Sequence, residues 1–568
     1  MAGFGAWVAG RLVAEFQIPF LLALLAGVAA AVPLGMIFAL PAVRTRGINL
    51  AIVTLGLGTA IELMLFNNSK FTGGIQGTPV GNPSLFGFEI SSIRHPARYG
   101  IFVLAMAVLT VVVVANVRRG RSGRRLIAVR TNERAAAALG INIVTAKLFA
   151  FAFASAIAAL GGILVAFRLT SISYQSFDNF TSITYAGLSL VGGVGHLLGA
   201  FVGALMATAG FNQEVMESTW GGVGAYIQLI SGIAILLVVL YNPDGVAAEW
   251  AKSFRYMKRT KKFGESYFIK LSDVSEPVAE GHDQRVPPKS LDVDNLTVKY
   301  GAVTAVDDVS FSIEPGRVTG LIGPNGAGKT TFFNVLTGFE KADGGSWHFQ
   351  GHDLSGKPAY AIARAGMVRT FQTARVFPRL SVMDNVRLGA TGQIGERLSS
   401  ALLRWRWRPQ EAELGERAAE VIEWVGLGAK RDDLAGTLSG GQRKLLELAR
   451  AVMARPSLLM LDEPMAGVNP ALRQSLLDRI RDLAADGVTV LFVEHDMDVV
   501  SSIAEVVVCM AEGRIIAKGT PGEVAADERV IEAYLGASSG DLRDVERDTG
   551  RAPGSVPGSD DGDGEAGS

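Results

Sequence analysis

The chain has one cysteine, Cys509, among its 568 residues. A single thiol excludes an internal disulfide framework, and it is typical of a protein whose water-soluble part faces a reducing compartment. The chain also lacks a surplus of either charge, because 54 basic residues balance 54 acidic ones. Without a basic surplus we expect no nucleic-acid partner.

Charge is scarce in the first 250 residues, which hold 15 Lys/Arg and 9 Asp/Glu between long apolar runs. Residues 541–568 instead hold 8 acidic and 3 basic residues. We therefore predict a membrane domain over 1–250, a polar cytoplasmic linker over 251–290, a water-soluble domain over 291–537 and an acidic, Gly-rich tail over 538–568. We expect the tail to be disordered.

Six apolar runs in the first half are each long enough to cross a bilayer, which needs about 20 residues. They cover residues 18–40, 48–66, 99–117, 146–167, 183–209 and 223–241. Buried helices of a soluble protein would rarely recur at this length with so few charges. We expect an α-helical multi-pass domain in the cell membrane, and no separable signal peptide is visible.

Basic residues follow the first, third and last of these runs. They are Arg44 and Arg46, the arginines within 118–130, and the lysines and arginines within 252–262. The positive-inside rule makes all three clusters cytoplasmic. The loop 67–98 and the N-terminus are then external, and the domain that follows the last cluster is cytoplasmic.

Three of the apolar runs lie between the basic clusters at 118–130 and 252–262. Because both clusters are predicted to be cytoplasmic, the chain must cross the membrane an even number of times between them. The run 183–209 is the best candidate for one that does not span, because Leu188–Ala204 contains five glycines. A re-entrant pair of half-helices fits it where irregular backbone is buried in protein. The alternative is an ordinary Gly-rich packing helix, with another run misjudged.

The second half contains GPNGAGKTT, which fits the phosphate-loop pattern G-x-x-x-x-G-K-[ST]. Small residues let backbone N–H groups close around a polyphosphate, the Lys reaches the β/γ-phosphates, and the Thr hydroxyl holds Mg²⁺. A strand-like run, Val318–Gly323, precedes the loop, and a helix is predicted from about Lys329. The predicted nucleotide-binding residues here are Gly323, Pro324, Asn325, Gly326, Ala327, Gly328, Lys329, Thr330 and Thr331.

Further motifs lie on both sides of the loop. Before it, Tyr300 ends the strand-like run 291–300, and a second such run covers 303–313. After it come, in this order, RTFQ with Gln372, LSGGQ at Leu438–Gln442, LLMLDEP with Asp462 and Glu463, and VEHD with His495. Together they resemble the nucleotide-binding domain of ABC transporters over 291–537. The resemblance implies an α/β P-loop NTPase fold and ATP hydrolysis.

The resemblance also implies roles for single residues. Tyr300 offers a face to adenine, Thr330, Asp462 and Gln372 hold Mg²⁺, and Glu463, His495 and Gln372 are catalytic around the attacking water and the γ-phosphate. Taken singly, Tyr300 is equally a surface aromatic, and His495 a strand-end histidine satisfied by backbone.

The signature residues Leu438, Ser439, Gly440, Gly441 and Gln442 complete the ATP site of a facing domain in this family. One phosphate loop and one signature in a chain therefore imply a second ABC ATPase subunit or a second copy. The chain has Asn469 where many relatives have Asp, which leaves cross-subunit contacts there open.

The segment TNERAAAALGINI, Thr131–Ile143, resembles the coupling loop of ABC importer permeases, with Glu133, Ala136 and Gly140 at the matching positions. Such a loop docks on an ATPase. The alternative is a short amphipathic helix with no special role.

Longer strings narrow the family. Arg369–Val386, LSGGQRKLLELARA, DEPMAGVNP, VEHDMDVV and Val530–Gly536 resemble the ATP-binding subunit of branched-chain amino-acid importers. Arg44–Gly58, Phe71–Gly77 and Leu190–Ala204 resemble a permease subunit of the same importers. The chain thus resembles a natural permease–ATPase fusion that begins inside a Gly-rich string of the permease, Ala2–Gly10, so that helices upstream or on another polypeptide are expected.

This resemblance implies ATP-driven import of Leu, Ile or Val, with a second permease subunit, an extracytoplasmic substrate-binding protein and the lipid bilayer as partners. Related systems carry urea, short amides or other amino acids, and these stay open as substrates. Two further alternatives are an ABC exporter half-transporter and a soluble ABC ATPase that the apolar half merely anchors.

Overall fold

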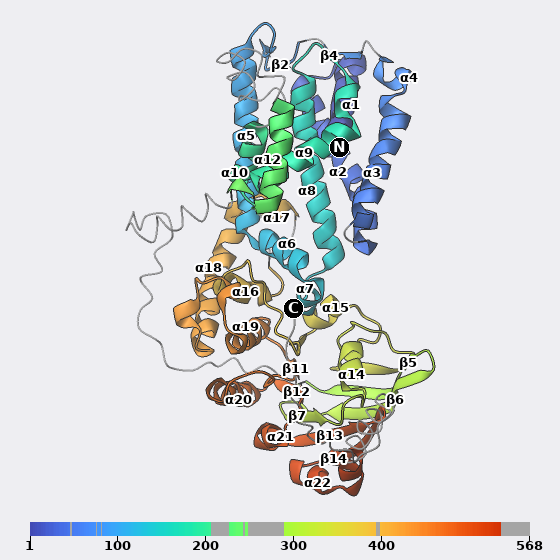
Figure 1. Cartoon of the computed structure of the whole chain (residues 1–568), viewed down its shortest axis with the longest axis vertical. Helices are drawn as coiled ribbons and strands as arrows, with labels where there is room; N and C mark the ends of the chain where they lie inside the picture. The colour runs from blue at the N-terminus through green and yellow to red at the C-terminus, as the bar shows by residue number, and fades with distance from the viewer. Residues whose placement is uncertain are drawn as a thin grey trace, which may run out of the picture. The chain divides into compact units, whose positions relative to one another are not determined.

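The computed structural model describes residues 1–45, 48–74, 77–80, 82–205, 227–241, 245–247, 289–393 and 398–534. The chain divides into two compact units (Figure 1). The first comprises Met1–Leu126, Ile143–Gly281 and Ile394–Trp407, and the second comprises Ile127–Asn142, His282–Gln393 and Arg408–Ser568. The predicted tail, the basic residues at 252–262 and all but the last two residues of the predicted linker lie outside the described residues.

The first unit is built from apolar helices. They are α1 (Ala2–Phe16), α2 (Phe20–Arg44), α3 (Ile48–Ile61), α5 (Pro96–Arg119), α8 (Ile143–Ala166), α9 (Asn179–Gly192), α10 (Leu197–Leu205) and α12 (Ile227–Tyr241). Among the described residues, four stretches are long and apolar enough to cross a membrane: Phe20–Val43, Asn49–Phe66, Pro96–Arg119 and Ile143–Ala166. They match the first four predicted runs.

Helix α1 lies outside the six predicted runs, and the structure adds it to this unit. It packs against α2 and α8, which also pack against each other. A Cβ on Gly5 would lie only 2.6 Å from the Cβ of Ala159, and one on Gly27 would lie 2.7 Å from the carbonyl oxygen of Gly5. Small residues therefore allow these three backbones to approach closely, as they do between helices in membranes.

The fifth predicted run is interrupted, since α9 ends at Gly192 and α10 begins at Leu197. Gly193 and Gly195 between them have φ of 105° and 109°, which residues with a side chain rarely adopt. Helices α9 and α10 pack against each other. The break fits a re-entrant pair, whose depth in a membrane stays a prediction. Residues 206–226 lie outside the described residues. They include the end of the fifth run and the start of the sixth.

The loop predicted to be external contains short elements. They are α4 (Ser69–Thr72), β1 (Thr78–Pro79), β2 (Ser84–Leu85) and β3 (Phe88–Glu89), and β1 pairs antiparallel with β4 (Ser171–Ile172). Gly73 and Gly77 have φ of 75° and 71°, and a Cβ on Gly77 would collide with the carbonyl oxygen of Ile172. Turn geometry therefore accounts for these two glycines.

The second unit contains a six-stranded sheet with the order β10-β11-β12-β7-β13-β14. The strands are β7 (Val318–Ile322), β10 (Met367–Arg369), β11 (Leu458–Asp462), β12 (Thr489–Val493), β13 (Val506–Ala511) and β14 (Arg514–Gly519). Neighbours run parallel, apart from the antiparallel pair β13–β14. The predicted α/β fold is confirmed.

A four-stranded antiparallel sheet with the order β6-β5-β8-β9 belongs to the same unit. Its strands are β5 (Leu291–Tyr300), β6 (Val303–Ile313), β8 (Gly344–Phe349) and β9 (His352–Asp353). The first two match the predicted runs 291–300 and 303–313 residue for residue. In each, β-branched residues recur in an alternating pattern that is typical of strands.

The remaining helices of the chain are α6 (Arg121–Thr131), α7 (Glu133–Ala138), α14 (Lys329–Leu336), α15 (Ala359–Arg364), α16 (Val382–Gly389), α17 (Leu398–Ala401), α18 (Arg404–Trp424), α19 (Gly440–Met453), α20 (Pro470–Ala485), α21 (Met497–Ile503) and α22 (Pro521–Ala526). Helix α14 begins at Lys329, as predicted. Helix α17 and the first residues of α18 belong to the first unit.

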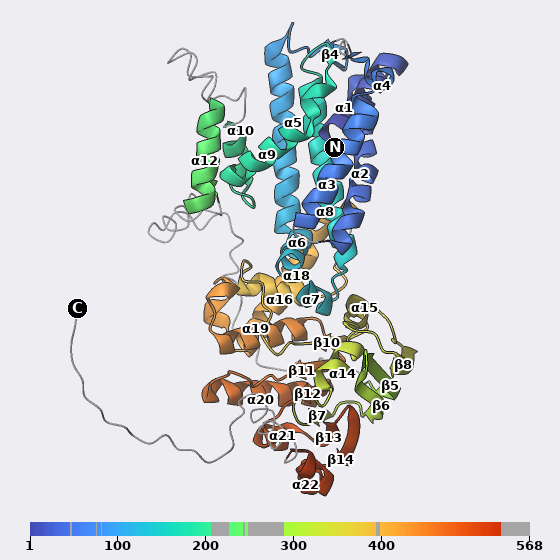
Figure 2. The ribbon, with the colours of Figure 1, turned by 45° about the vertical axis from the view of Figure 1, so that its right-hand side comes forward.

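The six-stranded sheet is buried on both faces. On β11, Leu459 and Leu461 join a core with α19, α20 and α21, whereas Leu458 and Met460 join a second core with α14 and the antiparallel sheet. Figure 2 shows α20 and α21 on one side of these strands and β5 and β6 on the other. Because both faces are buried, these strands are unbroken apolar runs in the sequence.

Candidate active site

Four neighbouring parallel strands end at one edge of the sheet. Asp462 at the end of β11 lies opposite Val493 of β12, which lies opposite Leu321 of β7. Directly beyond these ends come Glu463, His495 and the phosphate loop, and Gln372 follows β10. Ligands bind outside the carboxyl ends of strands in open α/β sheets. The topology thus brings together motifs that the sequence separates.

The phosphate loop is shaped by glycine. Gly323, Gly326 and Gly328 have φ of 146°, 81° and 94°. A Cβ on Gly323 would collide with the carbonyl oxygen of Met510, whereas one on Gly326 would meet nothing within 4 Å. The first N–H groups of α14 have no intrahelical partner and attract anions. The loop is therefore an open, glycine-shaped cradle that fits a polyphosphate.

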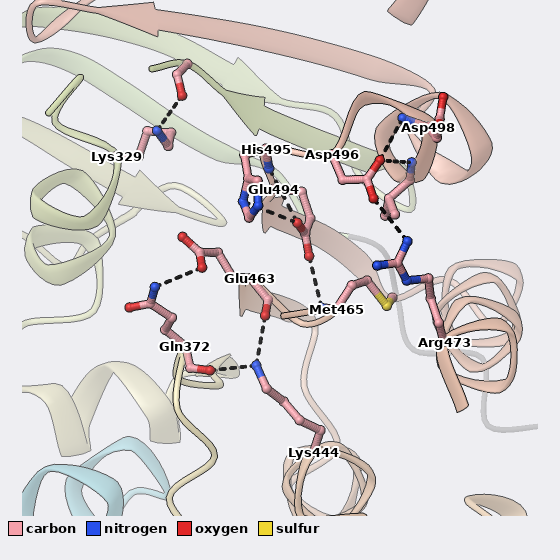
Figure 3. Close-up of polar contacts among 12 residues, drawn as sticks. Lys329, Gln372, Lys444, Glu463, Met465, Arg473, Glu494, His495, Asp496 and Asp498 are labelled. Atoms are coloured by element: carbon pink, nitrogen blue, oxygen red, sulfur yellow. Dashed lines mark hydrogen bonds and ion pairs between the residues drawn. The ribbon is translucent and has the colours of Figure 1, made fainter. Parts of the chain in front are cut away.

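The side chain of Lys329 folds back toward the first residues of this loop (Figure 3). Its Nζ donates to the carbonyl oxygens of Gly323 at 2.6 Å and Pro324 at 2.8 Å. Burial lowers the pKa of Lys329, while the nearby Glu463 and Asp462 oppose that shift. The ammonium group is thus held at the loop, where it can neutralise phosphate charge.

Gln372 and Glu463 meet across the edge of the sheet (Figure 3). The amide Nε2 of Gln372 donates to Oε2 of Glu463 at 2.8 Å. The backbone of Glu463 has φ of 45°, in the left-handed region that costs energy for a residue with a side chain. Its N–H donates to the carbonyl oxygen of Val493 at 3.0 Å. Two of the three predicted catalytic side chains therefore form one pair.

His495 presents an exposed ring at the end of β12, with 65 % of its side chain accessible. The neighbouring Glu494 is buried and accepts a 2.9 Å hydrogen bond from the N–H of Met465. Its carboxylate lies 3.9 Å from Nδ1 of His495, and burial raises the pKa of Glu494. The ring of His495 thus faces solvent at the site edge.

Asp462 forms a buried ion pair. Its Oδ2 lies 2.8 Å from the guanidinium of Arg369, and the two side chains are 6 % and 3 % exposed. Arg369 also donates to Oδ1 of Asn334 at 2.6 Å. Burial lowers the pKa of Arg369, and the Asp462 carboxylate opposes that shift. Arg369 therefore fixes the orientation of Asp462.

The predicted Mg²⁺ ligands offer the oxygen donors that this cation prefers. Thr330 is an exposed residue of α14, and the amide nitrogen of Gln372 is engaged by Glu463, which leaves the amide oxygen for a cation. A carboxylate has about four lone-pair sites, so pairing with Arg369 does not exhaust Asp462. Among the described residues there is no cluster of three or more His, Cys, Asp or Glu side chains that could hold a metal.

Tyr300 ends β5, with 52 % of the residue exposed. Its hydroxyl donates to the carboxylate of Glu340, and this bond raises the pKa of Tyr300. A weaker effect in the opposite direction comes from a hydrogen bond to Thr331 of α14. The exposed ring next to the phosphate loop fits the stacking face predicted for adenine.

The signature residues form the beginning of α19. Ser439 accepts from the N–H of Gln442 at 3.3 Å, and Gln442 accepts from the N–H of Ser439 at 3.0 Å. This reciprocal capping box stabilises the start of the helix. Gly440 is exposed, Leu438 is buried, and a Cβ on Gly441 would lie 2.7 Å from Leu472.

The signature residues hydrogen-bond to residues near them in the sequence, such as Leu438 to Ala435 and Ser439 to Arg443. Among the described residues, no hydrogen bond links Leu438–Gln442 to Gly323–Thr331. Asn469 caps α20 by accepting from the N–H of Leu472 at 2.9 Å. Asn and Asp cap helices about equally well, so this local structure tolerates either residue.

The predicted coupling segment belongs to the second unit, as part of residues 127–142. Asn132 caps α7, Ala136 is fully buried, and α7 packs against α15. Gly140 has φ of 74°, and its carbonyl oxygen accepts a 2.7 Å hydrogen bond from Nε of Arg364. Glu133 begins α7.

Three further residues at the site are absent from the predicted set. Arg369 pairs with Asp462, Lys444 of α19 donates to the carbonyl oxygens of Gln372 and Glu463, and the Tyr534 hydroxyl accepts a 2.9 Å hydrogen bond from the N–H of Gly323. All three lie within strings that resemble the importer ATPases. Because these strings contain several other charged and polar residues, the sequence pattern alone does not single out the three.

Three family models match the chain. One described as "ABC transporter" matches residues 306–466, and one described as "Branched-chain amino acid transport system / permease component" matches residues 1–239. A third, described as "Branched-chain amino acid ATP-binding cassette transporter", matches residues 514–539.

Several known proteins are similar to the chain. A probable branched-chain amino acid transport ATP-binding protein, LivG, from Archaeoglobus fulgidus is 40% identical over 45% of this chain and 98% of its own length. BraF from Pseudomonas aeruginosa, a high-affinity branched-chain amino acid transport ATP-binding protein, is 41% identical over 43% of this chain and 97% of its own length. A crystal structure of a nucleotide-free ATP-binding cassette from an ABC transporter is 38% identical over 43% of this chain and 98% of its own chain, with a TM-score of 0.39.

Proposed function

We propose a function from one premise: this chain belongs to the family of branched-chain amino-acid ABC transporters and joins their permease and ATP-binding components in one polypeptide. Its function is ATP-driven import of branched-chain amino acids, Leu, Ile and Val, across the cell membrane. The observation that supports this most directly is that both halves match components of the same transport system.

ATP hydrolysis takes place at the edge described above. The cradle Gly323–Thr331 binds the phosphates, and Lys329 neutralises charge that develops on them. Glu463 orients the attacking water, and Gln372 holds its carboxylate in place. The exposed ring of His495 contacts the γ-phosphate, and Tyr300 stacks on the adenine.

Mg²⁺ is the cofactor that these residues fit, with the Thr330 hydroxyl, Asp462 and the Gln372 amide oxygen as its ligands. When bound, it neutralises charge on the phosphate oxygens. Arg369 holds the Asp462 carboxylate in one orientation, so the ligand is fixed before the cation arrives.

The partners follow from what one chain contributes. Ser439 and Gln442 cap the start of α19. Because the signature completes the ATP site of a facing domain in this family, we assign Ser439 and Gly441 to the ATP site of a second ABC ATPase, either another subunit or a second copy. A second permease subunit and an extracytoplasmic binding protein complete the importer. The ATPase domain is cytoplasmic, and the apolar helices lie in the lipid bilayer.

Residues 127–142 are the coupling element in this proposal. Their helix α7 packs on α15, and the Arg364–Gly140 hydrogen bond holds the residues that follow it. Movement of α15 during the ATP cycle is transmitted to the apolar helices on either side of the segment, α5 and α8. Glu133 begins this helix, and Ala136 lies on its buried face.

Uptake competition in the native host tests the substrate. In cells that lack the chromosomal copy and carry the full chain on a plasmid, excess unlabelled isoleucine or valine should abolish uptake of labelled leucine, while urea and acetamide should not. Competition by urea or acetamide alone would assign the chain to the amide-transporting relatives. ATP-dependent efflux of labelled leucine would assign it to exporters.

A further inference from the structure

Lys444 joins the two catalytic residues through their backbones. It lies on α19, three residues after Gly441, and its Nζ donates to the carbonyl oxygen of Gln372 at 2.6 Å and to that of Glu463 at 2.8 Å. Figure 3 shows the ammonium group between the two carbonyls. Because Gln372 and Glu463 also meet through their side chains, the three residues form a closed ring of hydrogen bonds.

Glu463 needs such a support. Its left-handed backbone, with φ of 45°, is unfavourable for a residue with a side chain and persists only when neighbours hold it. The N–H of Glu463 is held by the carbonyl oxygen of Val493 in β12. On the carbonyl side, Lys444 and the N–H of Ala466 at 3.2 Å are the donors.

Gln372 depends on Lys444 in the same way. It lies beyond the end of β10, and its side-chain amide can reach Glu463 only if the backbone of Gln372 stays in its present position. The carbonyl oxygen of Gln372 is bound by Lys444 across 72 residues of sequence. Lys444 therefore ties this loop residue to a long helix, α19, whose apolar face is buried in the core.

The charge of Lys444 strengthens both bonds. A hydrogen bond from an ammonium is about twice as strong as one between neutral groups. Burial lowers the pKa of Lys444, and the carboxylates of Glu447, Glu494, Asp462 and Glu463 oppose that shift. Lys444 thus stands among four acidic groups that favour its protonated form.

We propose that Lys444 is a positioning residue for ATP hydrolysis, which fixes the Gln372–Glu463 pair by binding both of their carbonyl oxygens. The inference rests on the proposed hydrolysis of ATP at this edge. It assigns Lys444 no contact with nucleotide. Its loss should therefore slow the chemical step and leave ATP binding nearly unchanged.

The test compares two lysines in the full chain, purified from its native host together with its partner subunits and placed in lipid nanodiscs. Lys444→Met removes the double donor, and Lys518→Met is the control, because Lys518 donates to a backbone carbonyl, that of Ser312 at 3.3 Å, away from the site. Misplacing catalytic groups by about 1 Å costs up to about 100-fold in rate. We expect Lys444→Met to lower kcat by about 10- to 100-fold with the Kd for ATP within about threefold of wild type.

Lys444→Arg separates positioning from general destabilisation, because arginine keeps the charge and the donors. It should recover at least part of the lost kcat, and Lys518→Met should keep the wild-type kcat. The inference is overturned if wild type hydrolyses ATP and Lys444→Met retains its kcat, or if Lys444→Met and Lys444→Arg both lose ATP binding. A wild-type complex that hydrolyses no ATP would instead overturn the proposed function on which the inference rests.

Discussion

The side-chain amide of Gln372 donates a 2.8 Å hydrogen bond to the carboxylate of Glu463, a residue 91 positions further along the chain. The two strands that precede them, β10 and β11, are neighbours in the sheet and run parallel. This pair converts two separate motifs into one site that can hold a water molecule for attack on a phosphate.

Replacing the carboxylate of Glu463 should separate ATP binding from hydrolysis. Glu463→Gln keeps the shape of the side chain but removes the base that orients water. General-base residues contribute about 10²- to 10⁴-fold to the rate, and we expect kcat to fall within that range. Binding of a fluorescent ATP analogue should stay within about threefold of wild type, since the cradle is unchanged. A kcat within twofold of wild type would remove Glu463 from its assigned role.

Gly140 should matter for coupling rather than for hydrolysis. Its backbone is left-handed, and a Cβ at this position would lie only 3.0 Å from Cγ of Arg364. Gly140→Ala therefore forces Arg364 or the segment itself to move. Changes along a coupling element alter coupling by about 0.5–2 kcal/mol, so we expect leucine transported per ATP hydrolysed to fall about two- to thirtyfold.

A matched control for Gly140 is Gly356, which also has a positive φ of 69° but would place a Cβ in open space. Gly356→Ala bears the same kind of backbone strain without touching Arg364, and it should transport leucine with the wild-type ratio. Equal losses in both variants would attribute the effect of Gly140→Ala to strain alone.

The buried pair of Arg369 and Asp462 should be important for stability. Arg369→Met leaves the Asp462 carboxylate buried without its cation, and breaking a buried pair in this way costs about 3–5 kcal/mol. The midpoint of thermal unfolding of the ATPase unit should fall accordingly. Arg529→Met removes an exposed partner of Asp527 and should leave the midpoint almost unchanged. An unchanged midpoint in Arg369→Met would contradict the assigned role.

Cys509 should react slowly in the folded chain. It is buried in β13, and burial raises its pKa from 9.0 to about 11. The reactive thiolate is therefore about 100-fold rarer at pH 7.5 than in an unfolded chain. Because a raised pKa delays ionisation, the rate of labelling by a disulfide reagent should keep rising through pH 10, whereas the denatured chain should level off above about pH 9. Equal rates at pH 7.5 in folded and denatured chain would contradict this.

The parts of the fold that local pattern determines were predictable from the sequence. The strands 291–300 and 303–313 and the start of α14 at Lys329 match their predicted positions. Alternating β-branched residues and a phosphate-loop pattern specify these elements without knowledge of distant contacts. The first four apolar runs were predictable for the same reason, since length and hydropathy alone define them.

Features that depend on distant partners were not predictable. Helix α1 is rich in glycine, which disfavours a helix in isolation. Its glycines face residues distant in the sequence, since a Cβ on Gly5 would lie 2.6 Å from Ala159 of α8 and one on Gly10 would lie 2.7 Å from Ile172. The predicted site residues include neither Lys444 of α19 nor Arg369 of β10. Their roles appear only when the sheet brings Gln372, Glu463 and Asp462 to them.

The most direct test of the account is uptake of labelled leucine by host cells that lack the chromosomal copy and express either the wild-type full chain or Glu463→Gln at equal membrane levels. Import driven by ATP hydrolysis at Glu463 predicts rapid accumulation with wild type and background accumulation with the variant. Equal accumulation with both chains, or none above background with either, would contradict the claim that this chain imports branched-chain amino acids by hydrolysing ATP.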